Sequence, residues 1–317
     1  MRGLYFDGKE LKYREDLPIP KREGEALIKV IYAGICNTDK EILKGYHNFS
    51  GIPGHEFVGI VEDAPTKELI GKRVVGEINV GCGKCSYCAS GLERHCPYRT
   101  VLGILERDGV FAEYTTLPEK NLHILPEGIS DIEGVFVEPI AAAFEIPEMV
   151  HLEPNEDLLI FGDGKLGLLI AQVMKLYMRH VVLIGKHKEK LKLAEEWGID
   201  GVLLQDVEKI GRFKYVVEAT GTQSGFKEAI AHIRPRGYLI LKSTTASGAE
   251  LNLSPVVVNE IHIIGTRCGP FPPAIRALSN RWIKVTDMIS EIFPLNRYKE
   301  AFLRNNEKNT IKVIFEI

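Results

Sequence analysis

The sequence lacks a strong excess of charge of one sign. Its 317 residues include 40 lysines and arginines and 43 aspartates and glutamates, for a formal net charge of −3. A chain so close to neutrality gives no electrostatic reason to bind a nucleic acid. The hydrophobic fraction of 45% and the charged fraction of 26% are those of a globular protein. We therefore expect no nucleic-acid partner.

A long hydrophobic run is also missing. The most apolar stretch, residues 158–174, is interrupted by Asp163 and Lys165, and it is too short and too polar to cross a membrane. Charged side chains enter the N-terminal segment at positions 7–10, which is not the pattern of a secretory signal. We therefore expect a cytoplasmic protein with no membrane partner.

Cysteine is scarce outside one short segment. Four of the six cysteines fall within residues 82–96, whereas Cys36 and Cys268 lie far from each other, which argues against a disulfide framework. The spacing C-x2-C-x2-C-x7-C lets four thiolates enclose one tetrahedral zinc ion with no open position for a substrate. The same thiolates could also hold an iron–sulfur cluster. The expected structural zinc ligands are Cys82, Cys85, Cys88 and Cys96.

The order of strand-like and helix-like segments predicts two domains. Short β-branched runs between glycines and prolines make the first 130 residues look all-β. Further along, strands alternate with helices, a pattern typical of a parallel sheet with helices on both faces. The segments expected there are strands at 158–161, 181–184, 215–218, 237–241 and 261–265, and helices at 166–177 and 188–197.

The end of the sequence is interpreted as a return to the first domain. A helix-like stretch and a strand at 311–315 follow the prolines around position 270. We therefore expect one domain to comprise residues 1–138 and 268–317, and the other to comprise residues 139–267.

A glycine-rich turn follows the first strand of the second domain. Gly162, Gly164 and Gly167 form the pattern Gly-x-Gly-x-x-Gly between an expected strand and an expected helix. The first glycine permits a tight turn, the second lets a pyrophosphate approach the backbone, and the third lets the helix pack on the sheet. The sequence therefore predicts dinucleotide binding.

The end of the next strand bears on which dinucleotide is preferred. A site that prefers NAD has Asp or Glu there to accept from the ribose 2′-hydroxyl. This chain has Gly185, followed by Lys186, His187 and Lys188, whose cationic groups could hold a 2′-phosphate. We expect NADP(H) to be preferred over NAD(H). In the alternative, Lys186 and Lys188 are solvated residues in the first turn of a helix.

A second set of metal-binding side chains lies upstream of the cysteine cluster. Cys36 ends an expected strand and is followed by Thr38 and Asp39. His55 stands beside Glu56 just ahead of another strand. A thiol and an imidazole with carboxylates nearby suit a metal site whose ligands are oriented by neighbouring acids.

Five motifs in this order resemble the zinc-dependent medium-chain alcohol dehydrogenases, and they run nearly from end to end. They are Cys-x-Thr-Asp at Cys36, Gly-His-Glu at Gly54, the four-cysteine segment, Val-Glu-Pro at Val137, and the glycine turn at Gly162. The resemblance implies a mixed α/β protein, with a GroES-like β domain and a Rossmann domain built on a doubly wound parallel sheet. It also implies a homodimer or homotetramer.

The resemblance further implies two zinc ions per chain, one structural and one catalytic. Cys36 and His55 would bind the catalytic ion, with Glu56 as a neighbouring or alternative ligand. Glu138 would take the third protein position, as in the polyol and sugar dehydrogenase branch. In the alternative, Glu138 caps the helix that follows Pro139.

The same resemblance suggests a proton relay. Thr38 would take the proton of the substrate hydroxyl, whose acidity the metal raises, and Asp39 would orient His55. The family often has histidine at the position of Glu41, so either Glu41 or His47 is expected as the next member.

The combined expectation is an oxidoreductase that transfers a hydride between a secondary alcohol, possibly of a sugar or polyol, and NADP(H). One alternative is a simple alcohol or aldehyde reductase of the same family. The other is a zinc-stabilised dinucleotide sensor without turnover.

Overall fold

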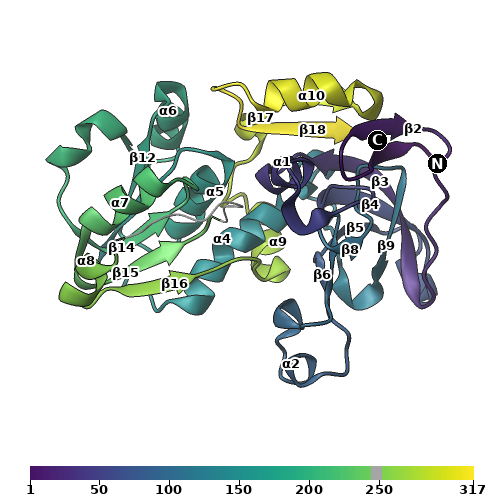
Figure 1. Ribbon diagram of the computed structural model, residues 1–317, viewed down its shortest axis with the longest axis horizontal. Helices are drawn as coiled ribbons and strands as arrows, with labels where there is room; N and C mark the ends of the chain where they lie inside the picture. Colours follow the sequence, from purple (N-terminus) through teal and green to yellow (C-terminus); the bar gives the residue numbers. More distant parts are fainter. Residues whose placement is uncertain (244–251) are drawn as a thin grey trace. The chain divides into compact units, whose positions relative to one another are not determined.

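The computed structural model describes residues 1–243 and 252–317. The chain divides into two compact units, which we call unit 1 (residues 1–138 and 289–317) and unit 2 (residues 139–288). Unit 2 is a continuous segment, whereas unit 1 is assembled from the segments before and after it (Figure 1). Among the described residues, no helix combines the length and the apolar character needed to cross a membrane.

Unit 1 is organised around a seven-stranded sheet. Its strands follow the order β10-β5-β4-β3-β18-β17, and β9 also pairs with β3. They span β3 (Glu25–Gly34), β4 (Glu56–Asp63), β5 (Arg73–Gly76), β9 (Tyr114–Pro118), β10 (Leu122–Ile124), β17 (Ile289–Pro294) and β18 (Lys312–Glu316). At the end of β3, Gly34 lies opposite Glu56 of β4 on one side and Ile314 of β18 on the other. This register brings residues from distant parts of the chain together.

Smaller elements complete unit 1. The strands β1 (Gly3–Phe6) and β2 (Leu11–Arg14) form a hairpin, and β6 (Asn79–Val80), β7 (Thr100–Leu102) and β8 (Glu106–Arg107) form a three-stranded sheet. The four-cysteine segment lies between β6 and β7. The helices of this unit are α1 (Asn37–Leu43), α2 (Ser86–Ala89), α3 (Asp131–Gly134), the first residues of α4 (Val137–Met149), and α10 (Tyr298–Asn305).

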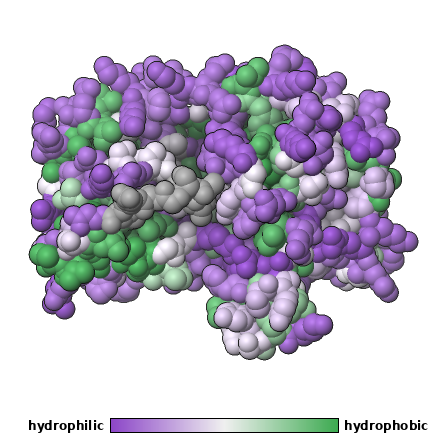
Figure 2. Space-filling model, viewed as in Figure 1, coloured by the Kyte–Doolittle hydropathy of each residue, from purple (hydrophilic) through white to green (hydrophobic). Residues whose placement is uncertain are grey.

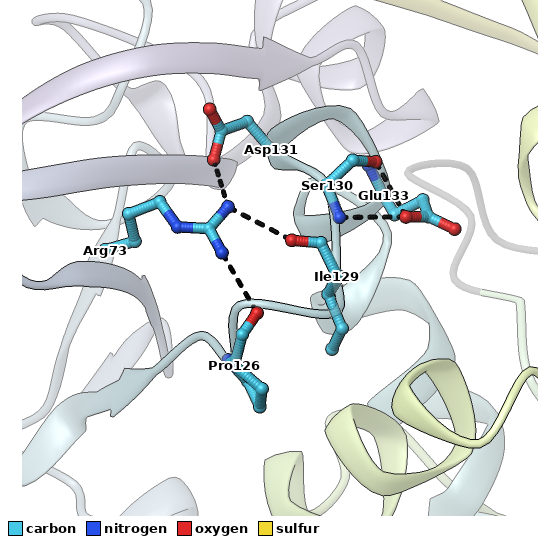
Figure 3. Close-up of polar contacts among 6 residues, drawn as sticks. All are labelled: Arg73, Pro126, Ile129, Ser130, Asp131 and Glu133. Carbon is cyan, nitrogen blue, oxygen red and sulfur yellow. Dashed lines mark hydrogen bonds and ion pairs between the residues drawn. The ribbon is translucent and has the colours of Figure 1, made fainter.

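The segment that leads toward Glu138 is fixed to the sheet by Arg73 of β5 (Figure 3). Its guanidinium donates to the carbonyl oxygens of Pro126 and Ile129, both at 3.0 Å, and to Asp131 Oδ1 at 2.7 Å. Ser130 begins α3 with a capping box, in which Glu133 accepts from the backbone and hydroxyl of Ser130. The bonds from Arg73 and this capping box fix where α3 begins.

Unit 2 is a parallel sheet with helices between its strands. The strand order is β13-β12-β11-β14-β15-β16, and all five neighbouring pairs are parallel. The strands are β11 (Asp157–Phe161), β12 (His180–Gly185), β13 (Asp200–Leu203), β14 (Phe213–Glu218), β15 (Ile233–Leu241) and β16 (His262–Gly265). The helices are the rest of α4, α5 (Lys165–Met174), α6 (Lys188–Glu196), α7 (Gln223–Ala231), α8 (Ser254–Val258) and α9 (Phe271–Ser279).

Both faces of the central strand β11 are buried. On β11, Leu159 and Phe161 join one hydrophobic cluster with Phe226 of α7, while the alternating residues Leu158 and Ile160 are fully buried as well. A strand that is covered on both faces consists of consecutive apolar residues, as expected in a parallel sheet flanked by helices. The mixed α/β class is confirmed, with one unit built on a mainly antiparallel sheet and the other on a parallel sheet.

The second domain boundary differs from the sequence-based expectation. The units divide at 288/289 rather than at 267/268, because the segment after β16 packs within unit 2. The side-chain amide of Gln172 on α5 exchanges two hydrogen bonds with the backbone of Lys284, at 2.8 and 2.9 Å. A Cβ on Gly269 would lie 1.8 Å from the carbonyl oxygen of Ala141. Pro270 is the N-cap of α9, and Pro272 and Pro273 belong to its first turn, where proline is tolerated.

Candidate functional site

The four clustered cysteines form a compact set of sulfurs. All four Sγ atoms lie within 4.8 Å of one another. Cys85 Sγ is 3.6 Å from the Sγ atoms of both Cys88 and Cys96. The short helix α2 begins directly after Cys85 and includes Cys88, and the chain returns to contribute Cys96 before β7. The four sulfurs thus close around a single point.

The surroundings of these sulfurs suit a thiolate-bound metal. Backbone N–H groups of Lys84 and Cys85 bond the sulfur of Cys82 and lower its pKa to about 6. The N–H groups of Cys82 and Tyr98 point to Cys96 Sγ at 3.5 and 3.4 Å. Burial raises the pKa of Cys88 to about 11, so a cation is needed to keep all four as thiolates. The donor set fits zinc in a closed structural site.

A second group of possible ligands lies at the end of β3. Ligand atoms of Cys36, His55 and Glu56 lie within 4.8 Å of one another. Cys36 is the N-cap of α1, and His55 and Glu56 stand at the start of β4, which pairs with β3. His55 and Glu56 are 3% and 1% exposed. A thiol, an imidazole and a carboxylate in this arrangement fit a zinc ion.

Asp39 supports this group from α1. Its carboxylate is fully buried, accepts from the backbone N–H of Cys36 at 2.7 Å, and places Oδ1 3.3 Å from His55 Nδ1. Burial is the largest single influence on the pKa of His55 and lowers it. The carboxylate of Asp39 and the thiol of Cys36 outweigh burial, and the pKa lies well above its usual value.

Lys312 completes the surroundings of Glu56, and the sequence did not suggest it. Its Nζ forms a buried ion pair with Glu56 Oε2, and both residues are 1% exposed. Burial lowers the pKa of Lys312 to about 8, while the charges of Cys36 and Asp39 act in the opposite direction. A Cβ on Gly34 would lie 2.7 Å from both Lys312 Nζ and Glu56 Oε2, so a larger residue there would require the pair to shift.

The remaining expected members of this site are more scattered. Glu138 is half-buried in the first turn of α4 and is not part of the group that contains Cys36. Thr38 Oγ1 lies 3.7 Å from Cys36 Sγ. Glu41 pairs with Lys44 at 2.9 Å. His47 is exposed, with its ring centre 4.1 Å from that of Tyr46. The structure thus brings Thr38 close to the ligands but leaves the expected further steps of the relay separate.

The glycine-rich turn in unit 2 is shaped by close packing. Gly162 has a φ of 119°, a backbone conformation that favours glycine. A Cβ on Gly167 would lie 1.8 Å from the carbonyl oxygen of Gly162, so α5 could not approach the turn with any other residue there. At Gly164 an added Cβ would meet nothing within 4 Å, which leaves open space at the start of α5. This is the cradle expected for a pyrophosphate.

A carboxylate lies against the end of β12 after all. Asp163, between the first two glycines, directs its side chain to Gly185, where an added Cβ would lie 2.4 Å from Asp163 Oδ2. This oxygen accepts from the backbone N–H groups of Lys186 and His187, both at 2.7 Å, and lies 2.9 Å from His187 Nδ1. The sequence-based argument that this place has no carboxylate is therefore wrong. Lys188 begins α6, as expected.

Glu218 organises the neighbouring strand ends and was also missed. It ends β14, is 4% exposed, and accepts from the backbone N–H groups of Thr220 at 2.7 Å and Gly221 at 3.1 Å. The hydroxyl of Ser243, just after β15, also bonds to it. The turn packs here, since a Cβ on Gly162 would lie 2.8 Å from the carbonyl group of Ala219.

Comparison with known proteins matches both units. Residues 22–127 fit the alcohol dehydrogenase GroES-like domain, and residues 166–291 fit the zinc-binding dehydrogenase domain. The D-arabitol-phosphate dehydrogenase of Enterococcus avium is 30% identical over 326 residues, covering 95% of this chain and 92% of that protein.

Two solved structures share the fold of the whole chain. The alcohol dehydrogenase RspB of Escherichia coli CFT073, solved with NADH, has a TM-score of 0.90 and 27% identity, covering 100% of this chain and 99% of its own. A zinc-binding dehydrogenase of Sinorhizobium meliloti 1021, solved with NADP, has a TM-score of 0.91 and 25% identity over the same shares.

The buried ion pair between Lys312 and Glu56 should contribute to the stability of unit 1. Lys312→Met should lower the free energy of unfolding by about 3–5 kcal/mol, because it removes the buried cation that pairs with the carboxylate of Glu56. Urea unfolding of the zinc-loaded protein, followed by a signal from unit 1, measures this loss. A double variant, Lys312→Met with Glu56→Gln, should recover most of it.

Lys44→Met is the matched control for this measurement. Lys44 also pairs with a glutamate, but its side chain is 68% exposed. Its loss should cost less than about 1 kcal/mol. Equal losses for Lys44→Met and Lys312→Met would contradict the importance of the buried pair.

Proposed function

Because this chain belongs to the zinc-dependent medium-chain alcohol dehydrogenases, we propose that it transfers a hydride between a secondary alcohol of a sugar or polyol and NADP(H). Membership of the family establishes an NAD(P)-dependent oxidoreductase, and the substrate class and the cofactor preference are the proposal. The observation that carries it is the group formed by half-buried Cys36 with buried His55 and Glu56, in a chain that also has a dinucleotide turn. The similarity to a D-arabitol-phosphate dehydrogenase supports the polyol class.

We propose two zinc ions per chain. One would be held by the four clustered cysteines as a structural ion, and the other by Cys36 and His55 as the catalytic ion. Because Lys312 engages the carboxylate of Glu56, we favour Glu138 as the third ligand and assign Glu56 the role of neighbouring acid. No disulfide links the six cysteines, all of which lie in the described ranges, and this agrees with a proposed cytoplasmic location.

The side chains around the second group have separate tasks in this proposal. When bound, zinc supplies a Lewis acid that raises the acidity of the substrate hydroxyl. Asp39 holds the ring of His55 by its Nδ1 edge. Thr38, whose hydroxyl lies near Cys36, accepts the proton of the substrate and passes it on. Glu41 and His47 are the candidates for the following step, and Glu41 would have to leave its pair with Lys44.

The preference for NADP(H) rests on the cations that follow β12. Lys186 and His187 come directly after Gly185, and Lys188 begins α6. Charge-assisted hydrogen bonds from such groups to a 2′-phosphate are stronger than neutral ones. Asp163 opposes this effect, so we propose a preference and not an exclusion of NAD(H).

Metal content and turnover, measured on the same preparations, test the proposed activity. Wild type should hold two zinc ions and oxidise polyols faster than short aliphatic alcohols at equal concentration. Cys36→Ala should hold one zinc ion and lose turnover, because it removes a ligand of the catalytic ion only. Elemental analysis and an NADPH absorbance assay give both quantities.

The alternatives give different results in this experiment. Short aliphatic substrates that outperform polyols would indicate a simple alcohol or aldehyde reductase. One zinc ion in both proteins, with dinucleotide binding but without turnover, would indicate a sensor. Cys268→Ala is the matched control, because Cys268 lies in neither group and should leave both quantities unchanged.

The cofactor preference has its own test. Lys186→Ala should weaken NADPH binding about tenfold, the loss expected for one charge-assisted hydrogen bond, and should change NADH binding less than twofold. Isothermal titration with each dinucleotide measures the affinities. Lys192→Ala on the exposed part of α6 serves as control. Equal weakening of NADPH and NADH would refute a role for Lys186 in recognising the 2′-phosphate.

We also propose that two chains associate through the edge of the sheet in unit 2. In the strand order, β16 is the last strand, with Ile263 39% exposed. Nearby, Val257 and Val258 of α8 are 76% and 79% exposed, and Figure 2 shows hydrophobic side chains gathered over this region. An uncovered strand edge with apolar side chains is a typical pairing surface.

Light scattering after gel filtration tests this association. Wild type should have twice or four times the chain mass of 35.5 kDa. Ile263→Lys should shift it toward the monomer, because a charge on an edge strand opposes pairing. Leu303→Lys, at an exposed apolar residue of α10 in unit 1, should leave the mass unchanged. A monomeric wild type would disprove the proposal.

A further inference from the structure

In unit 2, the side chain of Asp163 lies at the end of β12, where the strand's own last residue is a glycine. Gly185 ends β12 without a side chain, and Asp163 of the glycine-rich turn fills the space beside its Cα. An added Cβ on Gly185 would lie 2.4 to 2.5 Å from three atoms of Asp163. The two residues therefore depend on each other, because Asp163 can occupy this place only next to glycine. The carboxylate at this strand end therefore comes from the glycine-rich turn and not from the strand.

The carboxylate of Asp163 is held by one of its two oxygens. Oδ2 accepts both backbone N–H groups of Lys186 and His187, and it also contacts the ring of His187. Oδ1 takes part in none of these three bonds. The Asp163 side chain is 10% exposed, so it is fixed in direction and still reaches the surface. Such a carboxylate is preorganised as a hydrogen-bond acceptor.

Two lysines contribute positive charge near this acid. Burial lowers the pKa of Lys190 on α6, and Asp163 acts against that effect as the opposite charge. Lys165 begins α5 one residue after Gly164. Asp163 is therefore a negative group close to the cations Lys165 and Lys190, at the place where the adenosine ribose binds in dinucleotide domains.

We propose that Asp163 is the residue that selects between the two dinucleotides, by accepting a hydrogen bond from the adenosine ribose. The inference rests on the proposed dinucleotide dependence and deepens it. A carboxylate accepts from a ribose hydroxyl but repels a 2′-phosphate, whereas Lys186 and His187 favour the phosphate. Asp163 thus retains NAD(H) binding in a chain whose other residues at this place favour NADP(H).

Binding of NADH and NADPH to Asp163→Asn tests the proposal. The amide oxygen can still accept the three bonds that Oδ2 accepts, so the substitution removes the charge and leaves the turn in place. We expect the dissociation constant of NADH to rise about tenfold. That of NADPH should stay the same or fall. The ratio of the two constants, measured by isothermal titration, should therefore change by tenfold or more. Asp157→Asn, at the opposite end of β11, should change the ratio less than twofold.

A second variant moves the acid to the strand. Asp163→Gly combined with Gly185→Asp should restore the wild-type ratio within about threefold, because the carboxylate then comes from the end of β12. Gly185→Asp alone should melt at a lower temperature, because its Cβ meets Asp163. Recovery of the ratio in the double variant would separate recognition from a purely structural tie between the turn and α6.

Three results would overturn the proposal. An unchanged ratio in Asp163→Asn, or equal weakening of both dinucleotides, would leave Asp163 a structural tie only. If the substitution weakened NADPH binding more than NADH binding, Asp163 would act by orienting His187 toward the 2′-phosphate. The proposed preference for NADP(H) is tested separately, by the ratio of the two dissociation constants in the wild-type protein. That preference can therefore be wrong even if the effect of Asp163 is confirmed.

Discussion

The pairing of β4 and β18 on either side of β3 is the constraint on which unit 1 depends. It places Glu56 and Lys312 side by side beneath Gly34, with Cys36 two residues beyond the strand. Each charge would be costly in the interior without the other. The candidate ligands are therefore attached to strand ends and to the first residues of a helix, whose positions the sheet fixes. A site of this kind needs little reorganisation when a metal binds.

In unit 2, close backbone contacts at the glycines act together with buried acids such as Glu218. Gly167 lets α5 approach the carbonyl of Gly162. The glycine-rich turn also packs against the residues that follow Glu218. Glycine patterns of this kind are usually explained by the ligand. Here packing alone requires glycine at position 167, because a Cβ there would push α5 away from the end of β11.

The sequence predicted the parts of this molecule that depend on local pattern. The spacing of the four cysteines, the turn at Gly162 and the alternation of strands and helices each lie within a short segment. The features that the sequence did not reveal, Lys312 and Asp163, depend on residues in other segments of the chain. Lys312 lies within an apolar strand and is 256 positions from Glu56, so only the strand pairing reveals that it faces inward. Asp163 occupies a position of the glycine motif at which the motif itself has no preference.

The boundary between the two compact units differs from the sequence-based expectation for a related reason. The expected boundary at 267/268 lies just before the prolines around residue 270, two of which belong to the first turn of a helix in unit 2. Glu138 was placed by resemblance alone, and its neighbours in space depend on how α4 continues from α3. Local signals identify elements well, but they do not determine which surfaces those elements share.

The distance along the chain between Glu56 and Lys312 also has a consequence for biosynthesis. The whole of unit 2 lies between them, so a ribosome must make all of unit 2 before it can supply the partner of Glu56. At about 10 residues per second this interval is roughly half a minute. During that time unit 2 can complete its sheet, while unit 1 waits with an unpaired acid and an unfilled place beside β3. The part of the chain that is made first is the part that finishes folding last.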